Sequence, residues 1–312
     1  MWNYILFKRY FFTSQRIKID LTRLFSEKIS ILRIVKLKIK AFILRRGVVM
    51  HNLLEMALKG DIKSAAKIIT KIEDDLEGTE EILKEILLHT GRAHLIGITG
   101  PPGVGKSTMA SRLIEAYRKK NQKVGVIAVD PSSPFTGGAV LGDRIRMQEH
   151  GNDAEGVFIR SMATRGNLGG LSRATQNVAY LMDAMGMEVI IIETVGTGQA
   201  EVEIIKVSHT TIVMLSPGMG DAIQALKSGI LEIADIFVIN KADLEGADDT
   251  LRDIHYMLGL NADGRDWEPE VFKTVATNKE GINKLVEGLE KHKQYLIDSD
   301  SFMLPPKRRY IK

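Results

Sequence analysis

The stretch Gly100-Pro101-Pro102-Gly103-Val104-Gly105-Lys106-Ser107 decides the fold of this chain. An apolar run over residues 95–99 precedes it and predicts a buried strand. Met109, Leu113 and Tyr117 follow it in steps of four residues, which predicts one apolar face of a helix. A strand, a glycine-rich turn and a helix in this order are the context that a phosphate-binding loop of the pattern GxxxxGK(S/T) requires. The alternative interpretation is a glycine-rich turn that only links a strand to a helix.

The loop has the chemistry to hold a nucleotide. Gly103 and Gly105 lack a Cβ atom, so their amides can approach phosphate oxygens closely. These amides converge on the anion, and the positive end of the following helix adds to their effect. Lys106 is predicted to reach the β- and γ-phosphates, and Ser107 to ligate Mg²⁺. The loop residues expected to bind the nucleotide are Gly100, Gly103, Val104, Gly105, Lys106, Ser107 and Thr108.

Further strands are predicted along the chain. Their residues are 124–129, 189–193, 211–216, 235–240 and 271–275. These runs are almost continuously apolar, which indicates strands covered on both faces and therefore a mostly parallel sheet. We expect an α/β fold of the P-loop NTPase type, with helices flanking a central sheet. In such sheets ligands bind beyond the carboxyl ends of the strands.

The stretch Asn240-Lys241-Ala242-Asp243 follows a predicted strand and indicates guanine as the base. The carboxylate of Asp243 can accept from both N1–H and the 2-amino group of guanine. Adenine offers neither donor, so it would leave this carboxylate unpaired, which disfavours its binding. Lys241 is expected to cover the base and Asn240 to tie the loops together. The backbone N–H of Ala276, at the end of the last strand, is expected to reach guanine O6.

Three acidic residues are predicted near the phosphates. Asp130 and Glu193 each end a strand, and Asp143 lies in a Gly-Asp-Arg segment that resembles a switch loop. Together with Ser107 they are the candidate Mg²⁺ ligands. Asp130 could instead shape a turn, and Asp143 could instead cap a helix. A glutamate at position 193, where aspartate is usual, favours contact with the metal through a water.

The candidate catalytic residues are Lys106, Asp130, Glu193 and Lys227. Thr197 stands where small signalling GTPases carry the glutamine that orients water, which predicts slow hydrolysis that a partner must accelerate. Asp221, Gln224 and Lys227 lie along one side of a predicted helix. From their spacing alone, a solvated helix face is the favoured interpretation.

Composition limits the function classes. The chain of 312 residues has no cysteine, which excludes disulfides, thiolate metal sites and cysteine nucleophiles. No uncharged apolar run approaches the roughly 18 residues that span a bilayer. We expect four parts: a basic leader (1–49), a helical subdomain (50–93), a P-loop GTPase domain (94–280), and a C-terminal helix with a tail (281–312).

The leader carries 12 Lys and Arg residues against Asp20 and Glu27, while the remainder of the chain is mildly acidic. This distribution argues against a core that binds nucleic acid. The leader could be an amphipathic helix on an anionic membrane or a mitochondrial transit segment. A third interpretation makes Met50 the true start, so membrane contact is expected only if the leader exists. The expected location is the cytoplasm, or the mitochondrial matrix in a eukaryote.

Five ordered motifs, including Leu-Gly-Asp-Arg-Ile-Arg-Met and Glu-Thr-Val-Gly-Thr-Gly-Gln, resemble the methylmalonyl-CoA mutase-associated GTPases. This family of P-loop GTPases includes the MeaB, ArgK and MMAA proteins, and the similarity covers about residues 50–298. The resemblance implies a Mg²⁺-dependent GTPase that binds GTP and GDP. It also implies binding to an adenosylcobalamin-dependent acyl-CoA mutase, whose cofactor loading it gates and which it protects.

The resemblance further places Asp221, Gln224 and Lys227 in a third switch that faces the mutase. A C-terminal helical arm forms a homodimer in this family. This chain ends soon after residue 298, so a homodimer stays an open expectation.

Three other functions remain as alternatives. A metallocentre-assembly GTPase that delivers nickel would share the nucleotide motifs but needs thiol or imidazole ligands. An ATP- or GTP-dependent kinase or transport-coupled NTPase for basic amino acids would have to tolerate adenine at Asp243. A binding module without turnover would be insensitive to Lys106→Ala.

Overall fold

The computed structural model describes residues 50–76, 78–130, 153, 156–163, 173–194, 203–218, 233–260 and 266–302. The chain divides into two compact units, Met1–Leu53 and Leu54–Lys312. In the first unit the described residues, 50–53, are helical. The fold and the site described below belong to the second unit.

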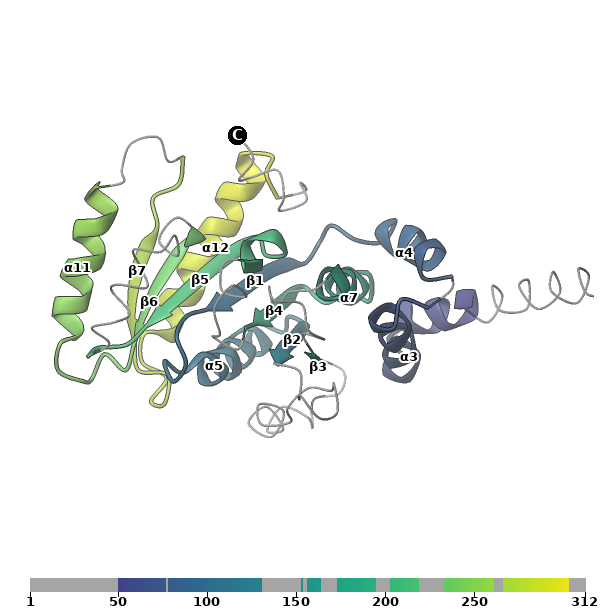
Figure 1. The fold of residues 1–312 in the computed structure, drawn as a ribbon, viewed down its shortest axis with the longest axis horizontal. Coiled ribbons are helices and arrows are strands. Elements are labelled where there is room, and N and C mark those ends of the chain that lie inside the picture. The colour runs from purple at the N-terminus through teal and green to yellow at the C-terminus, as the bar shows by residue number, and fades with distance from the viewer. Residues whose placement is uncertain are drawn as a thin grey trace, which may run out of the picture. The chain divides into compact units, whose positions relative to one another are not determined.

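Seven parallel strands form one sheet in the order β3-β2-β4-β1-β5-β6-β7 (Figure 1). The strands are β1 (His94–Thr99), β2 (Val124–Asp130), β3 (Val157–Ala163), β4 (Val189–Glu193), β5 (Thr210–Leu215), β6 (Ile236–Asn240) and β7 (Glu270–Thr274). Every residue of β1, β4, β5 and β6 is buried, which is why their apolar runs do not alternate. The predicted α/β fold with a mostly parallel sheet is confirmed.

Strand β3 was not predicted. Arg160 and Ser161 interrupt its apolar character, so the run does not stand out from a loop sequence. It lies at the edge of the sheet, where it pairs with β2 along all seven residues. The guanidinium of Arg160 forms an ion pair with Glu73 of α3 (Ile62–Glu73), which accounts for the charged residue in the strand.

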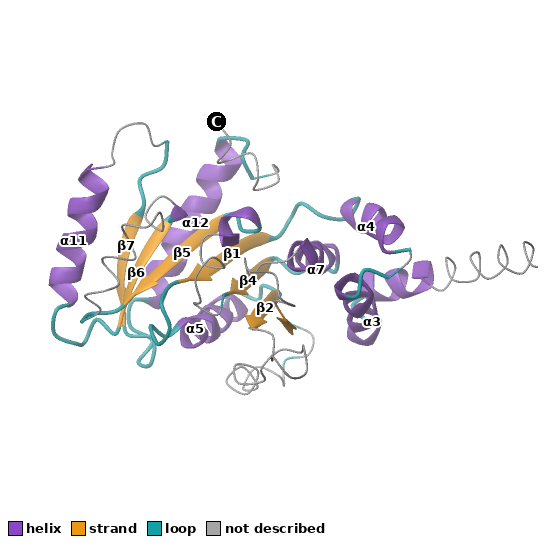
Figure 2. Ribbon diagram, in the orientation of Figure 1, coloured by secondary structure: helices purple, strands orange, loops and turns teal. Residues whose placement is uncertain are grey.

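Helices cover both faces of the sheet (Figure 2). On one face α5 (Lys106–Lys119) and α12 (Ile282–Asp298) bury apolar side chains against strand residues such as Ile98. On the other face α11 (Ala247–Leu260) packs on β5 and β6. Helix α7 (Arg173–Ala184) contacts β2 and β4, and a short 3₁₀ helix, η2 (Ile204–Lys206), lies next to β1.

Two helices that precede the sheet in sequence, α3 and α4 (Thr79–Leu87), pack against α7. Asp61 caps α3, because its Oδ2 accepts from the N–H of Ser64 at 2.9 Å. At the start of β1 the carboxylate of Asp183 accepts from the N–H groups of residues 91, 92 and 93. This buried carboxylate fixes the segment that leads from the helices into the sheet.

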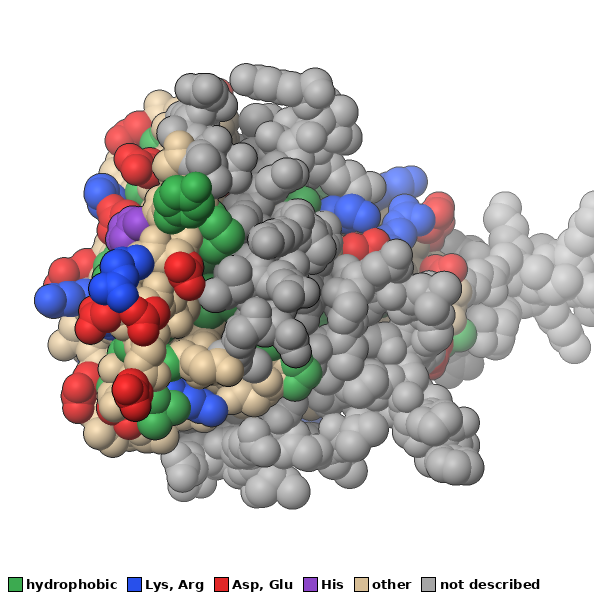
Figure 3. All heavy atoms as spheres, turned by 60° about the vertical axis from the view of Figure 1, so that its left-hand side comes forward, with side chains coloured by type: hydrophobic (Ala, Val, Ile, Leu, Met, Phe, Trp, Pro, Cys, Tyr) green, Lys and Arg blue, Asp and Glu red, His purple; other side chains and the backbone are tan. Residues whose placement is uncertain are grey.

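The outer surface carries charges of both signs. Figure 3 shows acidic and basic side chains interspersed on the face formed by α11. Asp249 and Arg252 form an exposed ion pair on this helix. Across the residues that the structure describes, no helix combines the length and apolar character needed to cross a bilayer.

Candidate nucleotide site

The glycine-rich loop joins β1 to α5, and its backbone requires glycine. Gly100, Gly103 and Gly105 have φ values of +138°, +80° and +94°. A Cβ atom on Gly100 would lie 2.2 Å from the carbonyl oxygen of Met214, and one on Gly105 would lie 2.5 Å from Nδ2 of Asn240. Gly105 is the N-cap of α5 and makes no side-chain cap hydrogen bond. The loop therefore presents backbone amides at a helix N-terminus, which is a geometry that binds phosphate.

Lys106 bends back along the loop that it follows. Its Nζ donates to the carbonyl oxygens of Gly100 at 2.7 Å and Pro101 at 3.1 Å, and the residue is 7% exposed. The charge of the lysine is thus held at the backbone of the loop itself. An ammonium group there is placed to neutralise phosphate oxygens that the loop amides bind.

The first metal-ligand candidates meet at the carboxyl end of the sheet. Ser107 Oγ donates to Glu193 Oε1 at 2.6 Å, and both side chains are buried. Because β4 lies beside β1, the end of β4 brings Glu193 to the first turn of α5. Hydroxyl and carboxylate oxygens are the ligands that Mg²⁺ prefers, so this pair fits the predicted ion.

Other predicted residues of the phosphate site are placed less completely. Asp130 ends β2, next to β4, but its side chain is not among those described. Asp143 and Lys227, together with the residues around them, lie outside the described ranges. Among the described residues, no group of three or more His, Asp and Glu side chains is arranged to hold a metal ion.

Asn240 joins the phosphate loop to the loop after β7. Its Nδ2 donates to the carbonyl of Val104 at 2.8 Å. Its Oδ1 accepts from Thr274 Oγ1 and from the N–H of Ala276, both at 3.1 Å. We expected this N–H to face guanine O6, but in the structure it donates to the Asn240 side chain. The asparagine therefore uses both ends of its amide to connect two loops.

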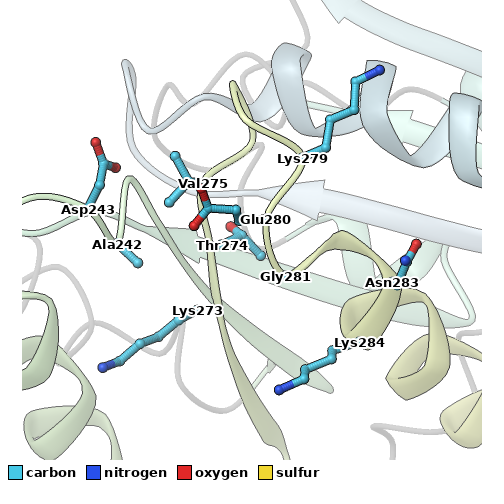
Figure 4. Close-up of a pocket in the computed structure, with 10 residues that line it drawn as sticks. All are labelled: Ala242, Asp243, Lys273, Thr274, Val275, Lys279, Glu280, Gly281, Asn283 and Lys284. Atoms are coloured by element: carbon cyan, nitrogen blue, oxygen red, sulfur yellow. The ribbon is translucent and has the colours of Figure 1, made fainter.

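A pocket of about 490 Å³ opens beside these loops (Figure 4). The loop of residues 241–243 and the segment of residues 279–284 lie on either side of the end of β7. Its lining consists of Ala242, Asp243, Lys273, Thr274, Val275, Lys279, Glu280, Gly281, Asn283 and Lys284. Lys241 has a φ of +57°, and the N–H of Ala242 donates to the carbonyl of Thr274 at 3.1 Å. These features hold the turn that carries Asp243 against β7.

No pattern in the sequence predicts that Lys273, Lys279 and Lys284 line this pocket. Each lies within eight residues of Ala276, which was expected at the end of the last strand. No motif marks them, because lysine is common on protein surfaces. The path of the chain from β7 through the following loop into α12 brings them to the pocket.

Comparison with known proteins identifies the family. The family model for the methylmalonyl-CoA mutase-associated GTPase MeaB matches residues 65–309. A protein of Pyrococcus abyssi is 51% identical over 261 residues, which are 83% of this chain and 80% of that protein. The chain belongs to the MeaB family. As a MeaB-family protein it is a P-loop GTPase, and the nucleotide that its family binds is GTP or GDP.

Two further relatives agree with this assignment. GTPase ArgK of Escherichia coli is 38% identical over 209 residues, which are 66% of this chain and 63% of that protein. The crystal structure of an LAO/AO transport system kinase matches with a TM-score of 0.66 at 25% identity, covering 84% of this chain and 80% of that one. The MeaB-family chain therefore shares its fold with a solved relative over most of its length.

Proposed function

We propose that this MeaB-family protein is a GTP-hydrolysing chaperone of an adenosylcobalamin-dependent acyl-CoA mutase of the methylmalonyl-CoA mutase type. It gates the loading of the mutase cofactor and protects the mutase. The family description, which names association with methylmalonyl-CoA mutase, supports the identity of the partner. The observation that carries the nucleotide switch is the 2.6 Å contact between Ser107 and Glu193, which joins the phosphate loop to the strand end before the Thr194-Val195-Gly196 segment.

Each residue of the proposed site has a role in binding or in charge neutralisation. Lys106 and the loop amides bind the β- and γ-phosphates. Ser107 and Glu193 hold Mg²⁺, with Asp130 and Asp143 as further proposed ligands. The metal, when bound, neutralises charge that develops on the phosphate oxygens. Asp243 selects guanine, and Asn240 fixes the loop that carries the phosphate amides.

The rate of hydrolysis is proposed to depend on the partner. Thr197 supplies no carboxamide to orient water, so the isolated protein should turn over slowly. Asp221, Gln224 and Lys227 are proposed to face the mutase and to accelerate hydrolysis when it binds. Lys227→Ala should therefore lose most of the stimulation that the mutase gives. A full stimulation in this variant would remove Lys227 from the mechanism.

A binding experiment tests the proposed partner. The full chain is immobilised and exposed to purified cobalamin-dependent acyl-CoA mutases with GDP, with a non-hydrolysable GTP analogue, or without nucleotide. We expect retention of a mutase that changes with the nucleotide, and loss of that change in Lys106→Ala. Equal retention in all three conditions would contradict a nucleotide-gated chaperone. Light scattering of the same samples determines whether the protein acts as a homodimer.

The proposed compartment follows from the partner. We place this protein in the same compartment as the proposed mutase, in the cytoplasm or in the mitochondrial matrix of a eukaryote. No role in nucleic-acid binding is proposed, and membrane contact is proposed only for a chain that retains residues 1–49. A protein found in another compartment than its mutase would contradict the chaperone function.

A further inference from the structure

Helix α5 begins at the phosphate loop and also holds the segment of residues 276–279, which follows β7 beside the pocket that Asp243 lines. We call residues 276–279 the base loop. Arg112 lies on α5, two turns beyond Lys106. Its Nε donates to the carbonyl oxygen of Ala276 at 2.8 Å, and its Nη1 donates to Glu115 Oε1 at 2.5 Å. The other oxygen of Glu115 lies 2.8 Å from Nζ of Lys279. Two side chains of α5 thus reach both ends of the short segment 276–279.

Ala276 is consequently held from two directions. Its N–H donates to Asn240, and its carbonyl accepts from Arg112. Asn240 in turn donates to Val104 of the phosphate loop, from which α5 begins. The contacts form a closed circuit: phosphate loop, Asn240, Ala276, Arg112 and back along α5. A movement of the base loop therefore strains the contact to the phosphate loop.

The pair on α5 is partly shielded from water. The side chains of Arg112 and Glu115 are 20% and 22% exposed, while that of Lys279 is 54% exposed. Partial burial alone would raise the pKa of Glu115. The hydrogen bond from Lys279 and the charge of Arg112 outweigh that effect and hold the pKa below its usual range. The carboxylate of Glu115 is therefore charged at neutral pH and can pair with both Arg112 and Lys279.

We propose that Arg112 and Glu115 are positioning residues that hold the base loop on α5 and thereby slow the departure of guanine nucleotide. This inference rests on the proposed nucleotide site. Their polar contacts given above are with each other and with residues 276 and 279, and the proposal gives neither residue a part in the chemical step. They act through Ala276 and Lys279 on the base loop, which forms one side of the pocket that Asp243 also lines. Loosening that wall should shorten the residence time of GDP.

The test measures the dissociation of a fluorescent GDP analogue from the full chain in Mg²⁺, chased with unlabelled GDP. Arg112→Ala should raise the dissociation rate by roughly tenfold or more, the size expected for loss of a charge-assisted hydrogen bond. Arg112→Lys keeps a cation near Glu115 but cannot place a donor where Nε lies, so its rate should fall between the two. Glu115→Gln should give a smaller increase, because Arg112 can still contact Ala276.

A matched control is Arg252→Ala, which removes an arginine that pairs with Asp249 three residues away on α11. Its dissociation rate should equal that of the wild type. Two further measurements separate positioning from general damage. The melting temperature without nucleotide should fall in Arg112→Ala by no more than in Glu115→Gln, because both variants remove the same ion pair. The KM for GTP should rise, while single-turnover hydrolysis at saturating GTP should stay within about twofold.

Failure of the proposed nucleotide site and failure of the positioning role give different results in this test. A wild-type chain that binds no GDP would contradict the nucleotide site itself. A wild-type chain that binds GDP, with an unchanged dissociation rate in Arg112→Ala, would overturn only the positioning role. A faster rate in Arg112→Ala, together with a fall in melting temperature without nucleotide that is larger than in Glu115→Gln, would assign Arg112 a structural role instead.

Discussion

At the scale of single residues, Asn240 shows how one side chain organises the site. Its amide is buried and uses both ends, toward Val104 on one side and toward Thr274 and Ala276 on the other. The close approach of Nδ2 to Gly105 also excludes any side chain there. The loops that we propose to bind the base and the phosphates are therefore connected through one side chain.

We propose that Asp243 selects the base, so its substitution should change which base is bound. In Asp243→Asn one acceptor oxygen is replaced by a donor, which faces the donors of guanine. The affinity for GDP should fall about 100-fold or more, because polar groups that the bound base covers are left unpaired. Xanthosine diphosphate, which has a carbonyl where guanine has its amino group, should bind the variant better than the wild type. Calorimetry with both nucleotides measures this, and Asp249→Asn on α11 is the control. Unchanged GDP affinity would contradict the role of Asp243.

The contribution of Glu115 should depend on pH in one direction. Its pKa lies below the usual 4.5, so the folded state favours the charged carboxylate. The stabilisation is fully present above pH 4.5 and is lost as the pH falls through the lowered pKa. The difference in unfolding free energy between wild type and Glu115→Gln should therefore be constant near neutral pH and shrink in acid. Urea unfolding at several pH values measures it. A difference that grows in acid would contradict this assignment.

At the scale of elements, a series of buried polar side chains connects the N-terminal ends of β1 and β5 with α12. His94 Nε2 lies 2.6 Å from Thr210 Oγ1, which lies 2.8 Å from Nδ1 of His292. The other ring nitrogen of His292 lies 3.4 Å from Asp235 Oδ1. A consistent arrangement has His94 donating to Thr210, Thr210 donating to His292, and His292 donating to Asp235. This polar series lies at the end of the sheet opposite the proposed nucleotide site.

Thr210→Val should interrupt this series of hydrogen bonds with little change in side-chain volume. It leaves two buried imidazoles without their shared hydroxyl, which should lower the unfolding free energy by about 2–3 kcal/mol. The dissociation of GDP should change little, since the site lies at the other ends of the strands. Denaturant unfolding gives the stability. Thr70→Val, at an exposed position of α3, is the matched control and should cost less than about 0.5 kcal/mol. A loss no larger than that of the control would show that the hydroxyl is dispensable.

At the scale of the whole molecule, the site exists only in the folded sheet. Its groups come from β1, β4, β6 and β7 and from α5, so nucleotide should bind the folded state alone. GDP at one hundred times its dissociation constant should then stabilise the protein by about 2.7 kcal/mol. That corresponds to a rise in melting temperature of about 5–10 °C for a domain of this size.

Thermal unfolding with GDP and with ATP at the same concentration measures this stabilisation. ATP should give little shift, because adenine cannot satisfy Asp243. Equal stabilisation by ATP would instead favour the kinase or transport-coupled NTPase for basic amino acids.

The sequence by itself determined the features that depend on neighbouring residues. The phosphate loop, the buried strands and the stretch proposed to select the base each lie within a short window, where glycine positions and continuous apolar runs report local geometry directly. Strand β3 could not be predicted in this way, because the charge of Arg160 is neutralised by an ion pair with Glu73, which lies far away in sequence.

Only the tertiary structure decided which of these windows meet. An apolar run shows that a strand is buried but not which strand lies beside it. The place of β4 between β2 and β1 puts Glu193 on Ser107, 86 residues earlier. The packing of α5 likewise puts Arg112 on Ala276, 164 residues later. Such contacts follow from strand order and helix packing, which arise from the free energy of the whole fold and leave no pattern in a short stretch of sequence.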